Sequence, residues 1–269
     1  MTAVAAKTTV ADLIAAFALP EAALINKRVT KKLVLENACS TAADRKLINE
    51  TIEDIQWVAA LKPSTIGVPE YQDEQRSYLE LAILTVTVRQ DEQTTAQRLQ
   101  RLIALLHRAI PYPVLLILAQ GEQTFISSTH IRSAHNAVDK IVLDGELLLA
   151  AVGTANQYNT QLEFLQSLNL SLQPREHLHA LYSAWMECLS AWQIAIATGS
   201  FTLSSNPEQS ASRRAALKRC TELDTQINAL RAAARKENQI ARQVAINLEM
   251  KSLQQERSHA FQALCATPH

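Results

Sequence analysis

The sequence contains little glycine, and this scarcity excludes several kinds of ligand-binding loop. Only five glycines occur among 269 residues. They build neither G-x-x-x-x-G-K nor G-x-G-x-x-G, the two patterns whose backbone surrounds nucleotide phosphates. The patterns G-x-S-x-G and H-E-x-x-H are also absent, which removes the serine of an α/β-hydrolase and the zinc ligands of a metalloprotease. We therefore expect no catalytic residues, no metal site and no cofactor, and a function other than catalysis.

The chain also lacks net charge, a membrane-spanning run and a regular cysteine pattern. A net charge of zero does not indicate whole-molecule attraction to nucleic acid or membrane. No apolar run reaches the length of a bilayer span. The four cysteines lie far apart, which is typical of reduced thiols in a cytoplasmic protein. Residues 1–21 carry Val10, Leu13 and Phe17 at helical spacing, which predicts a short amphipathic helix rather than a secretory signal.

What is present is the pattern of an α+β domain over residues 22–152. The apolar, β-branched run Tyr78–Val88 predicts an interior strand that is covered on both faces. We expect a helix over Asp91–Ile110, because leucines and isoleucines recur along one side of it and Pro111 follows. Further strands are predicted over residues 114–118, 124–130 and 141–152. Together these elements make a small mixed sheet with packed helices.

Another helix of this domain is predicted to begin after Thr41. Thr41 and Asp44 have the spacing of a helix N-cap with an acidic residue in the first turn. Apolar residues then recur every three or four positions, which predicts one continuous helix up to Pro63. Its expected buried side consists of Ile48, Ile52, Ile55 and Ala59.

The chain beyond residue 152 is predicted to be helical. Residues 153–199 form a helical layer packed on the α+β domain, with Trp185 and Trp192 in its core, and the serine-rich residues 200–212 indicate a linker. Residues 213–264 contain neither glycine nor proline, and their apolar residues recur at heptad spacing, which predicts a coiled-coil-like arm. A partner surface must cover this apolar stripe. The expected interface residues are Leu223, Ile227, Leu230, Val244 and Leu248.

Two geometries can cover the apolar stripe of the arm. The heptad phase breaks near Lys236–Gln239, and a second stripe of Ile246, Met250 and Leu253 follows. A turn at this break lets the arm fold back as an antiparallel helical hairpin. The competing geometry is a single rod that forms a homodimer. We favour the hairpin, although no glycine or proline forces a turn there.

Two groups of basic residues are the candidate nucleic-acid contacts. Cations this close together can neutralise neighbouring phosphates. No aromatic residue lies among the first group to stack on bases, and a solvated surface explains the same pattern, so both interpretations stay open. The first group is Lys27, Arg28, Lys31 and Lys32, and the second, in the arm, is Arg213, Arg214, Lys218 and Arg219.

Isolated histidines and one acidic residue give weak indications of metal chemistry. His177 and His179 are expected to point to different sides of a helix, and His130 and His135 flank an expected loop, so we predict that neither pair binds a metal. Glu80 lies in the expected interior strand, where a Mg²⁺-dependent nuclease would need E-x-K, but no lysine stands two residues later. We interpret Glu80 as a polar group at a sheet edge or an interface.

The order of these segments resembles a bacterial family known as domain of unknown function 4391. The stretches that carry the resemblance are INKRVTKKLVLENA (25–38), IEDIQWVAALKPSTIGV (52–68), LHRAIPYPVLLIL (106–118) and RKENQIARQVAINLEMKSL (235–253). The family offers no catalytic motif, and its members often lie beside helicases of the DEAD/DEAH type and site-specific DNA methyltransferases in phage-defence clusters. The resemblance therefore implies an accessory subunit of a DNA-modifying or DNA-translocating assembly.

Three functions follow, and we rank them. The first is a non-enzymatic scaffold whose core and arm bind a helicase or DNA methyltransferase subunit in an anti-phage system. The alternative is direct binding of nucleic acid through the two basic groups. The third and least favoured is a divergent metal-dependent nuclease that uses Glu80.

Overall fold

The computed structural model describes residues 8–38, 41–90, 95–134, 137–153 and 158–265. The chain divides into two compact units, Met1–Gln193 and Ile194–His269. The boundary between them falls within helix α7 (Leu178–Thr198). None of the helices in the described ranges has both the length and the apolar character that a bilayer crossing requires.

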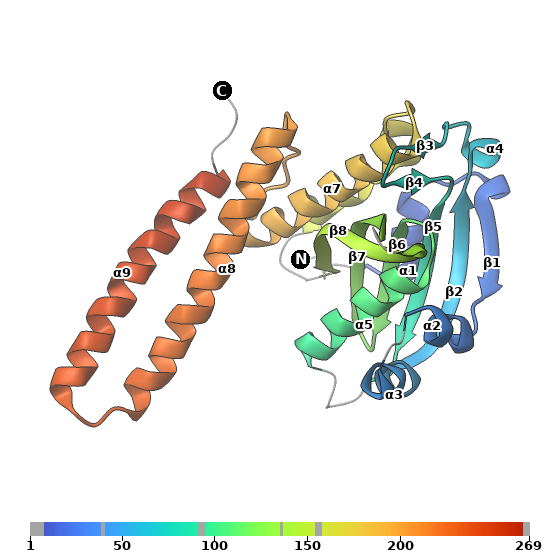
Figure 1. Cartoon of the computed structure of the whole chain (residues 1–269). Helices are drawn as coiled ribbons and strands as arrows, with labels where there is room; N and C mark the ends of the chain where they lie inside the picture. Colours follow the sequence, from blue (N-terminus) through green and yellow to red (C-terminus); the bar gives the residue numbers. More distant parts are fainter. Residues whose placement is uncertain (1–7, 39–40, 91–94, 135–136, 154–157, 266–269) are drawn as a thin grey trace, which may run out of the picture. The chain divides into compact units, whose positions relative to one another are not determined.

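The first unit is built on a six-stranded mixed sheet in the order β1-β2-β5-β6-β7-β8 (Figure 1). Neighbouring strands run antiparallel, except β5 and β6, which are parallel and are connected through helix α5 (Ala96–Ala109). The strands are β1 (Leu24–Arg28), β2 (Ile52–Leu61), β5 (Leu81–Val88), β6 (Val114–Gln120), β7 (Gln123–Ala134) and β8 (Ala137–Val152). A separate two-stranded sheet pairs β3 (Tyr71–Gln72) with β4 (Ser77–Tyr78). The predicted α+β class with a mixed sheet is confirmed.

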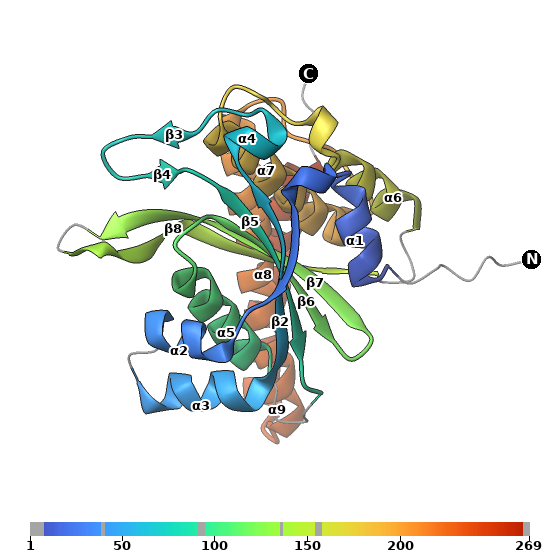
Figure 2. The same ribbon diagram turned by 90° about the vertical axis from the view of Figure 1, so that its right-hand side faces the viewer.

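Helices cover both faces of the six-stranded sheet (Figure 2). On one face, α2 (Lys31–Ala38), α3 (Ala42–Thr51) and α5 enclose an apolar core with alternate residues of β5 and β6. On the other face lie α1 (Val10–Ala16), α6 (Tyr158–Ser167) and α7. Trp185 and Trp192 of α7 are fully buried, as predicted. The short elements are α4 (Pro63–Ile66) and the 3₁₀ turns Glu21–Ala23 and Leu170–Leu172.

The helix that was predicted to run from Thr41 to Pro63 is wrong in its second half. Thr41 does cap α3, since its hydroxyl accepts a hydrogen bond from the amide of Asp44 at 3.1 Å. The helix ends at Thr51, however, and Ile52 begins strand β2. Two irregularities in the pairing of β2 with β5 put Ile52, Ile55 and the next buried residues three positions apart. Bulged strands thus imitate helical spacing, because each extra residue shifts the alternation by one.

The expected interior strand is confirmed over Leu81–Val88 but begins later than predicted. Its first four residues are all buried, as a strand covered on both faces requires. Tyr78 belongs to β4 instead, and Glu80 lies just before β5 rather than within it. The expected start of the next helix at Asp91 lies outside the described residues, and α5 begins at Ala96 with Thr95 as its N-cap.

The second unit contains two long antiparallel helices, α8 (Pro207–Lys236) and α9 (Ile240–Cys265), which pack as a hairpin. The hairpin geometry and the break at Lys236–Gln239 are therefore confirmed. Glu237 is extended and its carboxylate accepts the amide of Gln239 at 2.8 Å, so the turn forms without glycine or proline. Helix α8 begins within the expected linker, because the side chain of Asn206 caps it.

The residues between the two helices of the arm explain why the hairpin forms. Cys220, Leu223 and Ile227 of α8 are buried. On α9 the residues with little exposure are a separate set, Ile246, Met250, Leu253, Arg257, Ala260, Phe261 and Leu264. Ion pairs join the helices as well, with Arg219 at 2.5 Å from Glu256 and Arg257 at 3.1 Å from Asp224. The second apolar stripe of the sequence is therefore the side of α9 that packs within the arm.

Candidate functional site

The exposed apolar residues of the arm form one stripe on the first half of α9. Ile240, Val244 and Leu248 are 79%, 52% and 65% exposed. Their spacing of four residues places them on one side of the helix. Large apolar side chains at this exposure are uncommon as a contiguous row, which makes the row a candidate contact surface. We call these three residues the α9 stripe.

The structure separates the five residues that were predicted to contact a partner. Leu223 and Ile227 are buried, and Leu230 is half-buried. Val244 and Leu248 are exposed and belong to the α9 stripe. In this arm the two residues of α9 are the ones that a partner can reach.

Two of the four predicted basic residues of the arm, Arg213 and Arg219, are engaged in contacts within the second unit. Arg219 donates from Nε and Nη2 to the carboxylate of Glu256 at 2.9 and 2.5 Å. Arg213 is buried, and its Nη1 donates at 2.7 Å to a backbone carbonyl of the segment before α8. Arg214 is half-buried and Lys218 is exposed. The four residues therefore do not present one uniform cationic face.

The basic group near the N-terminus is also divided. Lys27 and Arg28 end β1, and Lys31 and Lys32 begin α2. Lys32 is exposed, whereas the ammonium of Lys31 donates to the backbone carbonyls of Asn49, at 3.4 Å, and of Ile52. Lys31 thus lies against the end of α3 and separates from its neighbour in sequence.

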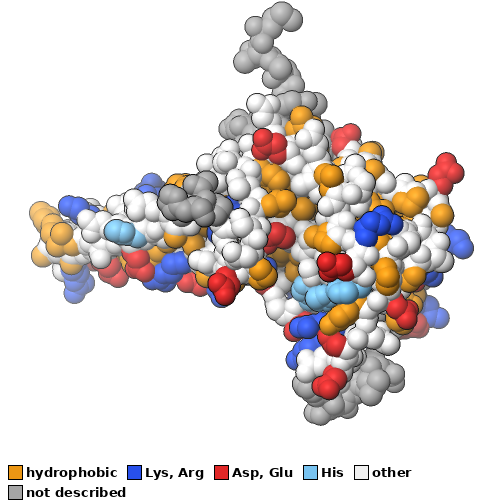
Figure 3. Space-filling model, turned by 90° about the horizontal axis from the view of Figure 1, so that it is seen from above, with side chains coloured by type: hydrophobic (Ala, Val, Ile, Leu, Met, Phe, Trp, Pro, Cys, Tyr) orange, Lys and Arg blue, Asp and Glu red, His pale blue; other side chains and the backbone are white. Residues whose placement is uncertain are grey.

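The first unit also brings together a cluster of aromatic and titratable side chains that the sequence did not predict. Its members come from the β3–β4 hairpin, from β7 and from the start of α7, and Figure 3 shows a patch of histidine on the surface of this unit. The rings of His130 and His179 stack with their centroids 5.1 Å apart. Tyr71 packs on both His177 and His179, at 4.6 and 4.9 Å. The hydroxyl of Tyr78 lies 2.5 Å from Nδ1 of His130.

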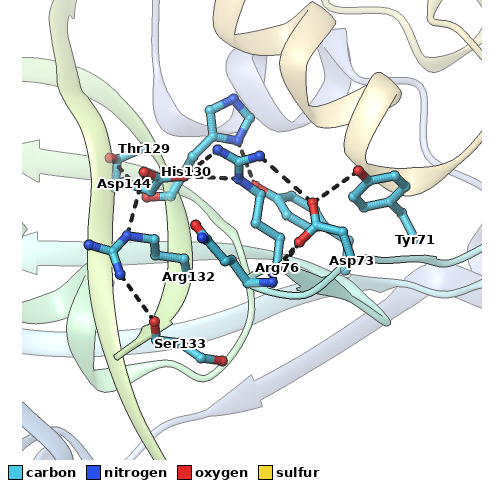
Figure 4. Close-up of polar contacts among 10 residues, drawn as sticks. Tyr71, Asp73, Arg76, Thr129, His130, Arg132, Ser133 and Asp144 are labelled. Atoms are coloured by element: carbon cyan, nitrogen blue, oxygen red, sulfur yellow. Dashed lines mark hydrogen bonds and ion pairs between the residues drawn. The ribbon is translucent and has the colours of Figure 1, made fainter. Parts of the chain in front are cut away.

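Ion pairs fix the β3–β4 hairpin beside these rings (Figure 4). Arg76 donates from Nε and Nη2 to the carboxylate of Asp144 on β8 at 2.9 and 2.7 Å. Asp73 accepts the amides of Gln75 and Arg76 and the hydroxyl of Tyr71, at 2.8, 2.6 and 3.0 Å. The contacts of Arg76 hold the hairpin against the six-stranded sheet, and those of Asp73 fix the turn of the hairpin itself.

The surroundings of His179, Tyr78 and Tyr71 favour the uncharged form of these three rings. Burial, the nearby charge of Arg76 and the neighbouring His177 lower the pKa of His179. Burial raises the pKa of the Tyr78 hydroxyl, and the hydrogen bond to Asp73 raises the pKa of Tyr71. The rings of the cluster pack on one another in stacked, tilted and edge-to-face pairs, so the arrangement can clamp the hairpin.

The expectation that His177 and His179 point to different sides of a helix is wrong. His177 precedes the first residue of α7, and its Nδ1 accepts the amide of Ala180 at 3.0 Å as a cap. The angular spacing of helical residues therefore does not apply to it, and both rings contact Tyr71. His135 lies outside the described residues. Among the described residues, no group of three or more histidine, cysteine, aspartate or glutamate side chains could hold a metal ion.

Glu80 has a partner that accounts for its burial. Its carboxylate lies 2.9 Å from Nζ of Lys62, which follows the last residue of β2. The hydrogen bond and the charge of Glu80 raise the pKa of Lys62. The pair joins the end of β2 to the start of β5.

Comparisons with known proteins match the chain to a protein family. No curated protein and no solved structure matches the chain. A family described as Domain of unknown function (DUF4391) matches residues 17–256, which span most of both units. The chain therefore belongs to the DUF4391 family.

Proposed function

We propose that the chain is a non-enzymatic accessory subunit that binds a helicase or DNA methyltransferase subunit of a bacterial anti-phage assembly. The contact is made by the α9 stripe, defined above as Ile240, Val244 and Leu248. Its natural occupant is a helix of the partner with its own narrow apolar stripe. Such helix-on-helix packing buries residues that recur every three or four positions on both sides.

The observation that carries the proposal is the exposure of the α9 stripe in an arm that already has a packed interior. The hairpin needs Ile246, Met250 and Leu253 for its own packing, and these are only partly exposed. The stripe is therefore not required for the fold of the arm. The kind of partner comes from the family resemblance, whose members lie beside helicases and DNA methyltransferases.

Co-purification from cells tests the proposal. The full chain is expressed with the helicase or methyltransferase encoded beside its gene, as the wild type and as the variant Ile240→Gln, Val244→Gln, Leu248→Gln. We expect the wild type to retain the partner. The affinity of the variant for the partner should fall at least tenfold, which corresponds to a loss of about 1.4 kcal/mol in binding free energy. Truncating a few well-packed apolar contacts at an interface commonly costs more than this.

A matched control places three glutamines on the exposed side of the other arm helix. Ala229, Ala232 and Ala233 of α8 are all exposed, so their change to glutamine leaves the α9 stripe intact. This control should retain the partner. Equal retention by all three proteins contradicts the role of the stripe, and a stripe-dependent doubling of molar mass without any partner shows that a second copy of the chain is the occupant instead.

A further inference from the structure

A pocket of about 460 Å³ opens at one edge of the six-stranded sheet. Its walls are the end of β1, the turn into α2, the start of β2 and the residue after β5. The backbone holds these segments together, because the amide of Val29 donates to Ile55 at 2.9 Å and that of Arg89 donates to Thr51 at 2.8 Å. Strands β1 and β5 both end here on either side of β2. The volume lies within the range of small-molecule sites, which is roughly 300–1,000 Å³.

Three cationic side chains line this pocket, those of Arg28, Lys31 and Arg89. Lys31 and Arg89 converge on one backbone oxygen, since Nζ of Lys31 lies 3.4 Å and Nη1 of Arg89 lies 3.2 Å from the carbonyl of Asn49. A carbonyl carries no net charge, so it orders the two cations without neutralising them. Burial, together with the charges of Arg89 and Arg28, lowers the pKa of Lys31. The surroundings of Lys31 therefore disfavour the positive charge that its ammonium group carries.

Two carboxylates also line the pocket, and they leave an excess of positive charge. Asp54 is occupied by Arg28, whose Nε lies 2.7 Å from it. Glu53 stands on the wall formed by β2. The lining thus combines cations with one exposed carboxylate and with the half-buried side chain of Val29.

Capping of α3 accounts for part of this arrangement. Lys31 and Arg89 donate to carbonyls of the last turn of α3, as basic residues at helix ends commonly do. An ammonium and a guanidinium have more N–H donors than these carbonyls occupy. Capping also does not require an adjacent pocket or a third cation beside it.

We propose that this pocket binds a phosphate group carried by a nucleotide or by a nucleic-acid strand. Lys31 and Arg89 donate to the phosphate oxygens, which compensates the two converging charges. Val29 contacts the sugar, and the carboxylate of Glu53 accepts a hydrogen bond from a sugar hydroxyl. The proposal is independent of the α9 stripe and of the accessory function proposed above. It also narrows the predicted basic group, because Lys27 and Lys32 do not line the pocket and Arg89 does.

Direct binding measurements on the full chain test this assignment. The probes are inorganic phosphate, a nucleoside 5′-monophosphate and a single-stranded oligonucleotide with a 5′-phosphate, each titrated at low and at high salt. The variants are Lys31→Gln and Arg89→Gln, with Lys31→Arg to restore the charge. Lys32→Gln is the matched control, since this neighbour is exposed and lies 3.8 Å from Glu36.

We expect the wild type to bind the probes at low salt. The affinity should fall about tenfold in each glutamine variant and should stay near that of the wild type in Lys31→Arg, which keeps the positive charge. The slope of affinity against salt should fall by about one for each cation removed. Lys32→Gln should bind within about twofold of the wild type. Preference for the oligonucleotide assigns the phosphate to a strand, and equal binding of the monophosphate assigns it to a nucleotide.

Two outcomes overturn the proposal. The first is the absence of binding of all three probes to the folded wild type at low salt. The second is a loss in Lys32→Gln equal to that in Arg89→Gln, which would show diffuse surface attraction and no pocket. Circular dichroism of each variant identifies a loss of fold, and the charge-restoring Lys31→Arg keeps the test decisive if a glutamine variant unfolds.

Discussion

Two leucine-to-alanine substitutions in the arm should differ sharply although they make the same chemical change. Leu223 on α8 is fully buried, and Leu248 on α9 is 65% exposed. Both were predicted from the sequence as residues that contact a partner. The structure makes Leu223 part of the interior of the hairpin and leaves Leu248 on its surface.

The expected magnitudes follow from burial. Leu223→Ala removes buried methyl groups and leaves a cavity, which costs roughly 2–5 kcal/mol in packed cores. We expect about 2–3 kcal/mol here, because two helices can move together to fill part of the space. Leu248→Ala should change stability by less than about 0.5 kcal/mol, since alanine is a better helix former and little surface was buried.

Hydrogen exchange of the arm amides measures this difference locally. Leu223→Ala should speed the exchange of α8 and α9 about 30-fold or more, since 1.4 kcal/mol corresponds to a factor of ten. Exchange in the β-sheet of the first unit should stay unchanged and serves as the internal control. Equal effects of Leu223→Ala and Leu248→Ala would refute the assignment of an inner and an outer side to the arm.

Three further predictions concern buried side chains of the first unit, the last with Cys265 of the second unit as its reference. Burial lowers the pKa of His107 to about 3, so its imidazole stays neutral in the folded chain while the unfolded chain takes up a proton below about pH 6.5. The free energy of unfolding should therefore fall by about 1.4 kcal/mol per pH unit from pH 6.5 towards 3 on account of this residue, and urea titrations of His107→Gln should lack that part of the slope. Tyr182→Phe should cost about 1–3 kcal/mol in thermal unfolding, because the buried hydroxyl donates to the carbonyl of Val114 at 2.7 Å. Burial raises the pKa of Cys188 to about 11, so iodoacetamide followed by peptide mass spectrometry should label the exposed Cys265 well before Cys188 in the folded protein.

The sequence predicted the long-range plan of the fold where periodicity was unambiguous. The covered strand over Leu81–Val88 follows from a continuous apolar run, and the hairpin in the arm follows from two heptad stripes with a break between them. It failed at β2, where bulges gave Ile52 and Ile55 a helical spacing. It also missed β1, because all five residues of this edge strand are exposed and show no alternation. Local patterns cannot distinguish these cases without the pairing partner.

The candidate sites were harder to predict because their residues meet only through the fold. The stacked pair His130 and His179 is separated by 49 positions in the sequence. Arg89 likewise joins Lys31 only because β5 and β1 flank the same strand. The first basic group, Lys27 to Lys32, was visible in the sequence. Which of its side chains lines the pocket depends on where α2 begins.

The most direct test of the central claim, that the α9 stripe is the partner contact, is site-specific photo-crosslinking. A photoreactive amino acid is placed at Val244, which is exposed on the stripe, or at Ala232, which is exposed on α8. Each protein is expressed with the neighbouring helicase or methyltransferase and irradiated in cells. The account predicts a crosslink to that partner from position 244 and none from position 232. A crosslink from position 232 alone, or from neither position while the proteins still co-purify, would contradict it.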